Sequence, residues 1–300
     1  MIAFQIFGLS IYWYGIFYFI SFLLGYYFLS FVGKKTYFKA FPALQQVLTQ
    51  HLETLMMFLL LGVLIGGRLG HVFIYDWGSF VGNWWAIFAV WNGGMSFIGG
   101  IVGVLLALVV FRFFFQLSRK EFVLLLDCVL VIVPVGIFLG RLGNFLNQEL
   151  YGISVQINGF SQFIRPDFVI NLLRKIGLLH IYPNVDGNLR VNTNLLSMLF
   201  EGITLFVLHS VLFRKMIKRQ LFQMGKITSW FMIGYSGFRF LFEYLREDSQ
   251  AEFVGFFTKS QRVFLVIFIC GIVLFVVSQK GNGIGQKKLC CEREDISSVQ

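Results

Sequence analysis

Apolar residues fill most of the chain in long runs, and short polar segments separate these runs. Each run comes close to or exceeds the roughly 20 residues that a helix needs to cross a bilayer. The pattern predicts transmembrane helices at residues 11–32, 54–75, 92–111, 122–142, 195–213, 227–245 and 262–279. The predicted fold class is therefore an all-α polytopic membrane protein with seven transmembrane helices.

The composition supports a membrane protein and excludes an ordinary soluble one. Of 300 residues, 57% are hydrophobic, only 13% are charged and 38 are phenylalanine. A soluble domain has no means of covering so much apolar surface. No charge occurs before Lys34, so the basic region of a cleavable signal peptide is missing and the first helix is expected to be retained. The four cysteines do not form a disulfide framework.

The positions of the basic residues predict which ends of the helices face the cytoplasm. If the N-terminus lies outside, the inside segments hold 15 of the 25 lysines and arginines, and the outside segments hold seven. Three more, Arg68, Arg141 and Arg239, lie within predicted helices. The positive-inside rule therefore predicts an outside N-terminus and an inside C-terminus. This distribution explains the net charge of +10, and we expect no nucleic-acid partner.

One long polar stretch interrupts the helices and predicts a small head outside the membrane. It covers residues 147–194 and is rich in turn formers around a possible short helix at 167–179. Helices one to four then occupy residues 1–146, and helices five to seven occupy residues 195–280. The glycine-rich, charged residues 281–300 are expected to be a disordered cytoplasmic tail.

The three arginines within helices are the first candidates for function, because charged side chains at membrane depth are costly and usually functional. A planar guanidinium matches a phosphate group with two parallel hydrogen bonds, and lipid headgroups supply phosphates at this depth. The alternative is structural: each arginine pairs with an acid such as Glu149 or Glu243, or extends to the membrane interface. Three arginines together favour a phosphate-binding cavity.

Polar neighbours accompany two of these arginines. In the stretch GRLGNFLNQELYG, helical spacing places Arg141, Asn144 and Gln148 on one face. The same spacing places Tyr235, Arg239 and Glu243 on one face of a later helix. A further segment, WNGGMSFIGGIVG at 91–103, leads into the third helix. Either its backbone N–H groups face an anion or its glycines allow tight helix packing.

Together these motifs resemble those of the bacterial prolipoprotein diacylglyceryl transferases, and the resemblance covers nearly the whole chain. The matching residues are Trp13-Tyr14-Gly15, Gly66-Gly67-Arg68, Trp91 to Phe97, Gly140, Arg141, Asn144, Phe145, Asn147, Glu149, Gly152, Gly234-Tyr235, Phe238-Arg239, Glu243 and Arg246. The signature is long and specific in position.

The resemblance implies a multi-pass enzyme of the bacterial inner membrane, with a periplasmic N-terminus, a small periplasmic head and a cytoplasmic C-terminus. Such enzymes transfer the diacylglyceryl group of phosphatidylglycerol to the lipobox cysteine thiol of a preprolipoprotein and release glycerol 1-phosphate. This is the first step of lipoprotein maturation, and it uses no metal or organic cofactor. The implied partners are phosphatidylglycerol, membrane lipid and the lipobox segment of the preprolipoprotein signal peptide.

The resemblance also implies roles for individual residues. The expected contacts with phosphatidylglycerol are Arg141, Asn144, Glu149, Tyr14, Arg68, Asn147 and Gly152, and the expected catalytic residues are Arg239, Tyr235 and His71. Arginines that hold the phosphate would stabilise the charge that develops on the leaving group.

Two segments depart from the family pattern. The family has a histidine after Met-Ser-Phe, proposed to activate the thiol, and Ile98 stands there in this chain. An isoleucine accepts no proton, whereas a thiol with a pKa of about 8.5 is mostly protonated at neutral pH. The family's His-Pro-Ser-Gln-Leu-Tyr-Glu run corresponds to Val191–Ser197, which keeps only the leucine.

Three explanations of Ile98 remain open. His71, three residues after Arg68 on the same helix face, acts as the base; or the arginines supply most of the catalysis; or the chain binds phosphatidylglycerol without turnover, as a lipid-binding or scaffold protein. His71 also has a structural alternative, an interfacial histidine with a local hydrogen bond. We favour retained transferase activity. A transporter would need a continuous polar path across the bilayer, and the polar clusters lie mostly near the outer helix ends.

Overall fold

The computed structural model describes residues 2–6, 9–74, 77–80, 85, 87, 94–155, 167–220, 223–250 and 253–297. The start of the glycine-rich segment, at 91–93, and the turn-rich residues 158–166 of the predicted head lie outside the described residues. The chain divides into two compact units. The large unit comprises residues 1–25 and 126–300, and the small unit comprises residues 26–125.

Within the described residues, six helical segments are long and apolar enough to cross a membrane. They are Trp13–Gly33, Leu52–Phe73, Phe97–Phe114, Arg119–Leu146, Thr193–Lys218 and Lys259–Gln279. The chain is thus a helical, multi-pass membrane protein, as predicted. The seventh predicted segment is helix α11 (Lys226–Glu243). Its 18 residues include Lys226, Arg239 and Glu243, so its composition is less apolar than that of the other six, and its crossing stays a prediction.

Close helix packing is the main feature of the small unit. This unit contains the end of α1 (Trp13–Gly33), η1 (Thr36–Ala40), α2 (Pro42–Gln50), α3 (Leu52–Ile74), α4 (Trp77–Phe80), α5 (Phe97–Phe114) and the start of α6 (Arg119–Leu146). A Cβ atom added to Gly66 of α3 would lie 2.5 Å from the carbonyl oxygen of Gly99 in α5. Small residues at this spacing let two helices approach backbone to backbone. Gly99 and Gly103 of the 91–103 segment therefore serve helix packing, one of the two roles predicted for its glycines.

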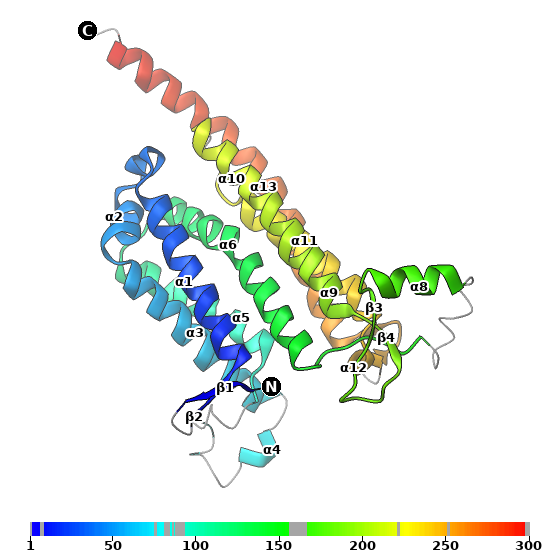
Figure 1. Ribbon diagram of the computed structural model, residues 1–300. Coiled ribbons are helices and arrows are strands. Elements are labelled where there is room, and N and C mark those ends of the chain that lie inside the picture. The colour runs from blue at the N-terminus through cyan, green and yellow to red at the C-terminus, as the bar shows by residue number, and fades with distance from the viewer. Residues whose placement is uncertain are drawn as a thin grey trace. The chain divides into compact units, whose positions relative to one another are not determined.

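The large unit combines long helices with a small head. Its elements are β1 (Ile2–Ile6), β2 (Leu9–Tyr12), the start of α1, the rest of α6, α8 (Asp167–Lys175), β3 (Leu179–Ile181), β4 (Leu189–Val191), α9 (Thr193–Ser197), the π-helical η4 (Met198–Thr204), α10 (Leu205–Lys218), α11, α12 (Glu247–Gln250), β5 (Phe253–Val254), β6 (Phe257–Thr258) and α13 (Lys259–Ser297). Helices α9, η4 and α10 follow one another without a break. Helix α11 packs against both α10 and α13 (Figure 1).

The head is a short β-hairpin covered by a helix. Strands β3 and β4 pair antiparallel, and the possible helix predicted near 167–179 is α8. The buried core of the head consists of Ile153, Val155, Leu179 and Val191. Ile170 and Leu173 of α8 pack against this core. Backbone hydrogen bonds from Gly152 to Val191 and from Ile153 to Leu245 connect the head to the chain that enters α9 and leaves α11.

Helix α13 has the bounds Lys259–Ser297 and is 39 residues long, so it extends into the segment predicted as a tail. Extending an existing helix fixes one residue for each new hydrogen bond, whereas starting a helix fixes several residues for one bond. The disorder of residues 281–300 stays a prediction.

Candidate active site

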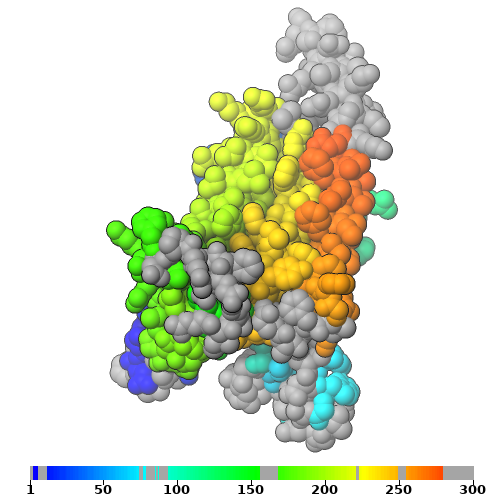
Figure 2. All heavy atoms as spheres, turned by 90° about the vertical axis from the view of Figure 1, so that its right-hand side faces the viewer, coloured from blue at the N-terminus to red at the C-terminus, as the bar shows by residue number. Residues whose placement is uncertain are grey.

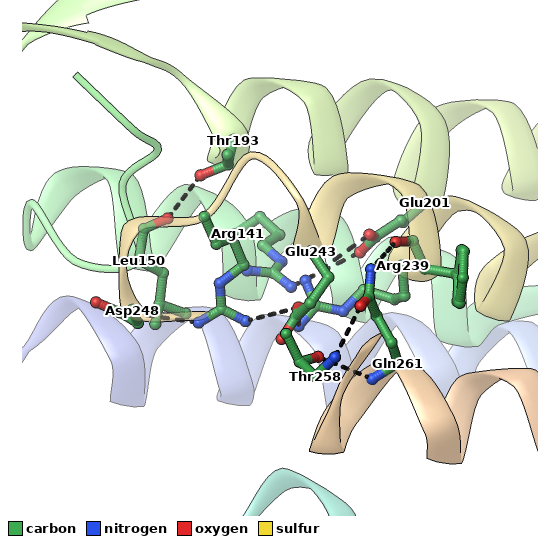
Figure 3. A network of polar contacts seen from close by, with 11 residues as sticks. Arg141, Leu150, Thr193, Glu201, Arg239, Glu243, Asp248, Thr258 and Gln261 are labelled. Carbon is green, nitrogen blue, oxygen red and sulfur yellow. Dashed lines mark hydrogen bonds and ion pairs between the residues drawn. The ribbon is translucent and has the colours of Figure 1, made fainter. Parts of the chain in front are cut away.

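A buried cluster of charged side chains lies in the large unit, where α6, η4 and α11 meet (Figure 3). Arg141 of α6 and Arg239 of α11 are 8% and 6% exposed, and Glu201 of η4 is completely buried. Arg141 Nη2 lies 3.7 Å from Glu201 Oε2, and Arg239 Nη1 lies 4.0 Å from Glu201 Oε1. One carboxylate therefore holds together two guanidinium groups that repel each other.

The cluster continues toward the end of α11. Arg239 Nη2 lies 3.8 Å from Glu243 Oε2, and Arg246 Nη1 lies 3.5 Å from the same oxygen. Arg246 also pairs with Asp248 at 3.4 Å, and Asp248 is exposed. Three arginines and two buried glutamates carry a formal charge of +1, and the exposed Asp248 at the rim balances it through Arg246.

The ion pairs of the cluster are longer than hydrogen bonds, which seldom exceed about 3.2 Å between nitrogen and oxygen. As far as the described residues extend, neither oxygen of Glu201 accepts a hydrogen bond and Nε of Arg239 donates none. Buried groups in this state are costly unless another partner completes their bonding. The arginines therefore keep donor capacity for a ligand that carries negative charge.

The backbone around Glu201 explains how it reaches both arginines. Glu201 lies in the middle of the π-helical segment η4. A π-helical turn contains an extra residue and is common at functional sites. A Cβ atom added to Gly202 would lie 2.8 Å from the Cβ atom of Phe138 in α6. The glycine thus lets η4 approach α6 one turn before Arg141.

Helix α13 supports Arg239 from the other side. Thr258 and Gln261 form a reciprocal cap at the start of α13, with hydrogen bonds of 2.9 and 3.1 Å between the backbone N–H of each and the side chain of the other (Figure 3). Gln261 Nε2 also donates to the carbonyl oxygen of Phe240 at 3.1 Å. The guanidinium of Arg239 lies 5.6 Å from the centre of the Phe264 ring, a favourable cation–π distance.

A second polar group brings together three predicted headgroup residues. The Tyr14 hydroxyl donates to Glu149 Oε2 at 3.0 Å and is also in hydrogen-bond contact with Asn144 Oδ1. Asn144 lies three residues after Arg141 on α6. A Cβ atom added to Gly143 would lie 3.2 Å from the ring of Tyr14, so α1 and α6 are close at this point.

The loop that carries Glu149 is held by residues at the start of α9. Gln148 and Leu150 have φ angles of 58° and 52°, a left-handed conformation that is uncommon for residues other than glycine. Thr193 Oγ1 donates to the carbonyl oxygen of Leu150 at 2.7 Å. Asn194 Nδ2 donates to the carbonyl oxygen of Glu149 at 2.8 Å. The segment that departs from the family pattern therefore fixes this loop.

Two other expected headgroup residues have backbone roles. A Cβ atom added to Gly152 would lie 2.5 Å from the carbonyl oxygen of Val191 and 2.8 Å from that of Leu245. Close backbone approach therefore requires glycine there. Asn147 is half-buried just after α6, and its backbone N–H donates to the carbonyl oxygen of Gly143 at 2.9 Å. Contact of either residue with a lipid stays a prediction.

Tyr235 lies one turn before Arg239 on α11 and is 5% exposed. Its ring stacks on Phe231 with 5.4 Å between centroids. Leu205 and Phe264 complete the buried apolar cluster around it. The ring is therefore fixed in position beside the arginine cluster, and its predicted catalytic role stays a prediction.

Arg68 and His71 belong to the small unit, on α3. Arg68 Nε donates to the carbonyl oxygen of Ile87 at 2.9 Å, and Nη1 donates to that of Gly94 at 3.3 Å. A Cβ atom added to Gly94 would lie 2.5 Å from His71 Nε2. Arg68 thus secures the backbone that leads into α5, and the imidazole of His71 packs against that backbone. Ile98, the second residue of α5, is half-buried.

Sequence reasoning missed Glu201 as a functional residue and used it only to align the family motif. The signal was available, because Glu201 is the only acidic or basic residue, histidine aside, between 195 and 213. The rule that selected the arginines, that charges at membrane depth mark sites, applies to it equally. The roles of Thr193 and Asn194 had no such signal, since their partners are backbone carbonyls of a distant loop.

The side chains gathered in the large unit suit an anion with hydroxyl groups next to it. They supply guanidinium, amide, phenol and carboxylate groups. In the part of the chain that the structure describes, no group of three or more histidine, cysteine, aspartate or glutamate side chains is arranged to hold a metal ion.

Comparison with known proteins identifies relatives over most of the chain. Residues 1–277 match the family model described as prolipoprotein diacylglyceryl transferase. The phosphatidylglycerol–prolipoprotein diacylglyceryl transferase of Rickettsia bellii is 32% identical over 282 residues, which cover 93% of this chain and 95% of the relative. The Proteus mirabilis protein of the same name is 30% identical over 92% of this chain and 90% of its own length. The Legionella pneumophila protein of that name is 32% identical, with coverages of 91% and 95%.

Proposed function

The chain belongs to the prolipoprotein diacylglyceryl transferase family, and we propose that it transfers the diacylglyceryl group of phosphatidylglycerol to a prolipoprotein cysteine. Both substrates appear in the names of its relatives. In this reaction the thiol sulfur attacks the glyceryl carbon that bears the phosphate ester. A C–S bond forms, the C–O bond to phosphate breaks, glycerol 1-phosphate leaves, and a base takes the thiol proton.

The observation that carries this proposal is the buried pair of arginines around Glu201. A phosphodiester has one negative charge, and it can pair with the guanidinium groups of Arg141 and Arg239, which share the single carboxylate of Glu201. As the C–O bond breaks, a second negative charge develops on the leaving phosphate. Arg141 and Arg239 are already in place to stabilise that charge, and fixed donors of this kind lower a barrier without reorganisation.

The group formed by Tyr14, Asn144 and Glu149 is proposed to bind the glycerol headgroup. Amide and carboxylate oxygens accept hydrogen bonds from hydroxyl groups, and the phenol donates or accepts. A small pocket lies beside Tyr14 between α1 and α6. It is lined by Tyr14, Phe17, Tyr18, Ser21, Gly136 and Gly140.

His71 is proposed to accept the thiol proton in place of the family histidine. It packs against the backbone at Gly94, in the segment that leads to Ile98. A neutral imidazole has a ring nitrogen that accepts a proton, whereas isoleucine has no basic group. Arg68, which binds two carbonyl oxygens of the same segment, is proposed to position this backbone.

The proposed setting is the bacterial inner membrane, crossed by seven helices that include α11. The excess of basic residues in alternate segments supports a periplasmic N-terminus and head and a cytoplasmic C-terminus. Arg141 lies five residues before the end of α6 in sequence, near the start of the head. A helix end on the periplasmic side is where phosphates of outer-leaflet lipids would lie.

The arginine proposal is tested with purified protein in phosphatidylglycerol nanodiscs and a lipobox peptide, by release of glycerol 1-phosphate. Arg141→Lys and Arg239→Lys keep the charge but remove the planar fork, so we expect activity to fall by roughly a hundredfold. Arg214→Lys, on the exposed side of α10, is the matched control and should retain full activity. Lysine variants as active as this control would exclude phosphate binding by the arginines.

The same assay, and complementation of cells depleted of their own transferase, separates an enzyme from a lipid-binding protein. A transferase converts a reporter prolipoprotein to the lipidated form. Bound phosphatidylglycerol with no glycerol 1-phosphate and only unlipidated precursor would show a binding protein instead.

The role of His71 has its own test. His71→Gln removes the base and is expected to lower the rate at neutral pH, and Ile98→His in that background is expected to restore part of it. Full activity of His71→Gln across the pH range would exclude His71 as the base.

A further inference from the structure

Helix α8 of the head has more apolar surface than the head covers. Its sequence, DFVINLLRK, places apolar side chains over roughly half of its circumference. Ile170 and Leu173 pack against the core of the head. Phe168, Leu172 and the following Ile176 form a second stripe at four-residue spacing, and they are 71%, 45% and 53% exposed. The described residues of the protein leave this second stripe exposed.

The orientation of α8 suits a surface rather than a helical bundle. In Figure 1, α8 extends from the side of the large unit across the direction of α10, α11 and α13. It leads through β3 and β4 into α9, so it lies at the end of the unit where α9 begins, α11 ends and α13 starts. Phe256, in the turn before α13, is 90% exposed at that same end. Figure 2 shows the green residues of the head to the left of the yellow and orange residues of the large unit.

Basic residues lie next to the apolar stripe of α8. Arg174 and Lys175 are exposed in the last turn of α8, and Lys175 borders the apolar stripe. A short helix with one apolar stripe and basic residues beside it lies in the interface of an anionic bilayer, with its apolar side chains at the boundary between headgroups and acyl chains. The basic side chains then reach lipid phosphates.

We propose that α8 is an interfacial helix that rests on the membrane crossed by the chain's own helices, with Phe168, Leu172 and Ile176 inserted among anionic lipids. The helix holds the head against the leaflet at the open end of the large unit. This attachment is separate from the chemistry of the arginine cluster, so it stands or falls without the transferase proposal.

The test places a single environment-sensitive fluorophore on α8 of the full-length protein. Cys128, Cys270, Cys290 and Cys291 are first replaced by alanine or serine, and one cysteine is then introduced at Phe168, Leu172 or Ile176. Asn171, exposed on the polar side of α8 and about 100° of helix rotation from the centre of the stripe, is the matched control position. The labelled proteins are placed in vesicles of phosphatidylglycerol and phosphatidylethanolamine, and each must elute as a single species from a sizing column.

Labels on the stripe are expected to show blue-shifted emission and quenching by spin-labelled lipid at least about twofold stronger than at Asn171. Aqueous iodide should quench the Asn171 label more strongly. Replacing Arg174 and Lys175 with glutamine should reduce the lipid quenching of the stripe in phosphatidylglycerol vesicles toward that in zwitterionic vesicles.

Three results would overturn the proposal. Iodide quenching of the stripe equal to that of Asn171 would show a water-facing helix. If the labels on the stripe are protected from both quenchers in vesicles that contain no added peptide, the stripe contacts protein, such as a second copy of the chain. Protection that appears only when a lipobox signal peptide is added would show a peptide-binding surface.

Discussion

At the scale of single residues, the geometry of the site depends on Glu201. Two guanidinium groups come from helices far apart in the sequence, and each would push the other away. Glu201 is the one acid within reach of both among the described residues. Its carboxylate pairs with both Arg141 and Arg239, and donors held in place in this way are what the proposed stabilisation of the leaving phosphate requires.

Replacing Glu201 with glutamine tests this role. The change leaves Arg141 and Arg239 without their shared partner, and breaking a buried ion pair in this way costs about 3–5 kcal/mol. We therefore expect a clearly lower Tm and a loss of glycerol 1-phosphate release. Thermal unfolding in nanodiscs and the release assay measure the two effects.

The matched control for this change is Glu247→Gln. Glu247 pairs with Arg190 at 3.4 Å, but its side chain is 39% exposed, and partly exposed pairs contribute about 0–1 kcal/mol. Its Tm should therefore change little. If the Glu201→Gln variant also has the Tm of the wild type and releases glycerol 1-phosphate at the wild-type rate, Glu201 does not position the arginines.

Sequence patterns predicted the residues of the candidate site more completely than they predicted which of these residues contact one another. Spacing along one helix predicted that Arg239 and Glu243 share a face, and the ion pair between them confirms it. Spacing within a helix carries no information about contacts between helices. The pairing of Arg141 with Glu201 depends on the π-helical turn and on the approach that Gly202 allows to Phe138, and both are products of tertiary packing.

At the scale of secondary-structure elements, the α3–α5 pair shows what the glycines do. A Cβ atom at Gly66 or Gly103 would overlap the backbone of the opposite helix, whereas one at Gly100 would lie 3.9 Å from the carbonyl oxygen of Val63. Gly66→Ala and Gly103→Ala are therefore expected to destabilise the protein by about 1–3 kcal/mol. Gly100→Ala should be neutral or slightly stabilising, because alanine favours helix.

Thermal unfolding of the three alanine variants measures this difference. The comparison is closely matched, because Gly100 and Gly103 lie on the same helix and receive the same methyl group. Equal Tm values for Gly100→Ala and Gly103→Ala would show that close α3–α5 contact does not contribute to stability.

The head depends on the Asp186–Arg190 pair, which closes the β3–β4 hairpin. Hydrogen bonds from Arg190 hold the pKa of the Asp186 carboxyl well below its usual range. An aspartate in an unfolded chain titrates near about 3.9. Because the folded pKa is the lower one, the contribution of this carboxyl to stability is complete above that value and is lost as the pH falls through the folded pKa.

Hydrogen-exchange protection of Leu179–Ile181 and Leu189–Val191 should therefore fall below about pH 4. Asp186→Asn is expected to lower this protection at neutral pH and to remove its dependence on acid. Identical protection in wild type and variant from pH 3 to pH 7 would exclude a stabilising role for the pair.

Short elements were the ones that sequence patterns missed. Strands β3 and β4 have three residues each, too few for an alternating pattern to be recognised. Strands β1 and β2 are apolar runs directly before the first predicted helix, and short apolar runs do not distinguish strand from helix. The long helices were predicted correctly because their hydrophobic runs are longer than any ordinary strand.

At the scale of the whole molecule, the distribution of charge and the number of crossings must agree. Six helices among the described residues satisfy length and composition for crossing, and α11 carries the buried arginine of the site together with two further charges. An even number of crossings places both termini on one side, and an odd number places them on opposite sides. The side of the C-terminus therefore decides whether α11 spans the membrane.

Alkaline phosphatase, active only in the periplasm, and green fluorescent protein, fluorescent only in the cytoplasm, give the required readouts as fusions. We expect a phosphatase inserted after Gly187, in the turn between β3 and β4, to be active, because the positive-inside rule places the head in the periplasm. Fusions after Gln220, beside the basic end of α10, and after Gln300 should be inactive as phosphatase and fluorescent as green fluorescent protein. If the phosphatase is active after both Gly187 and Gln300 and inactive after Gln220, the head and the C-terminus lie on the same side of the membrane. The number of crossings between them is then even. In that case α11 would enter the site without spanning the bilayer, and the seven-helix topology would be excluded.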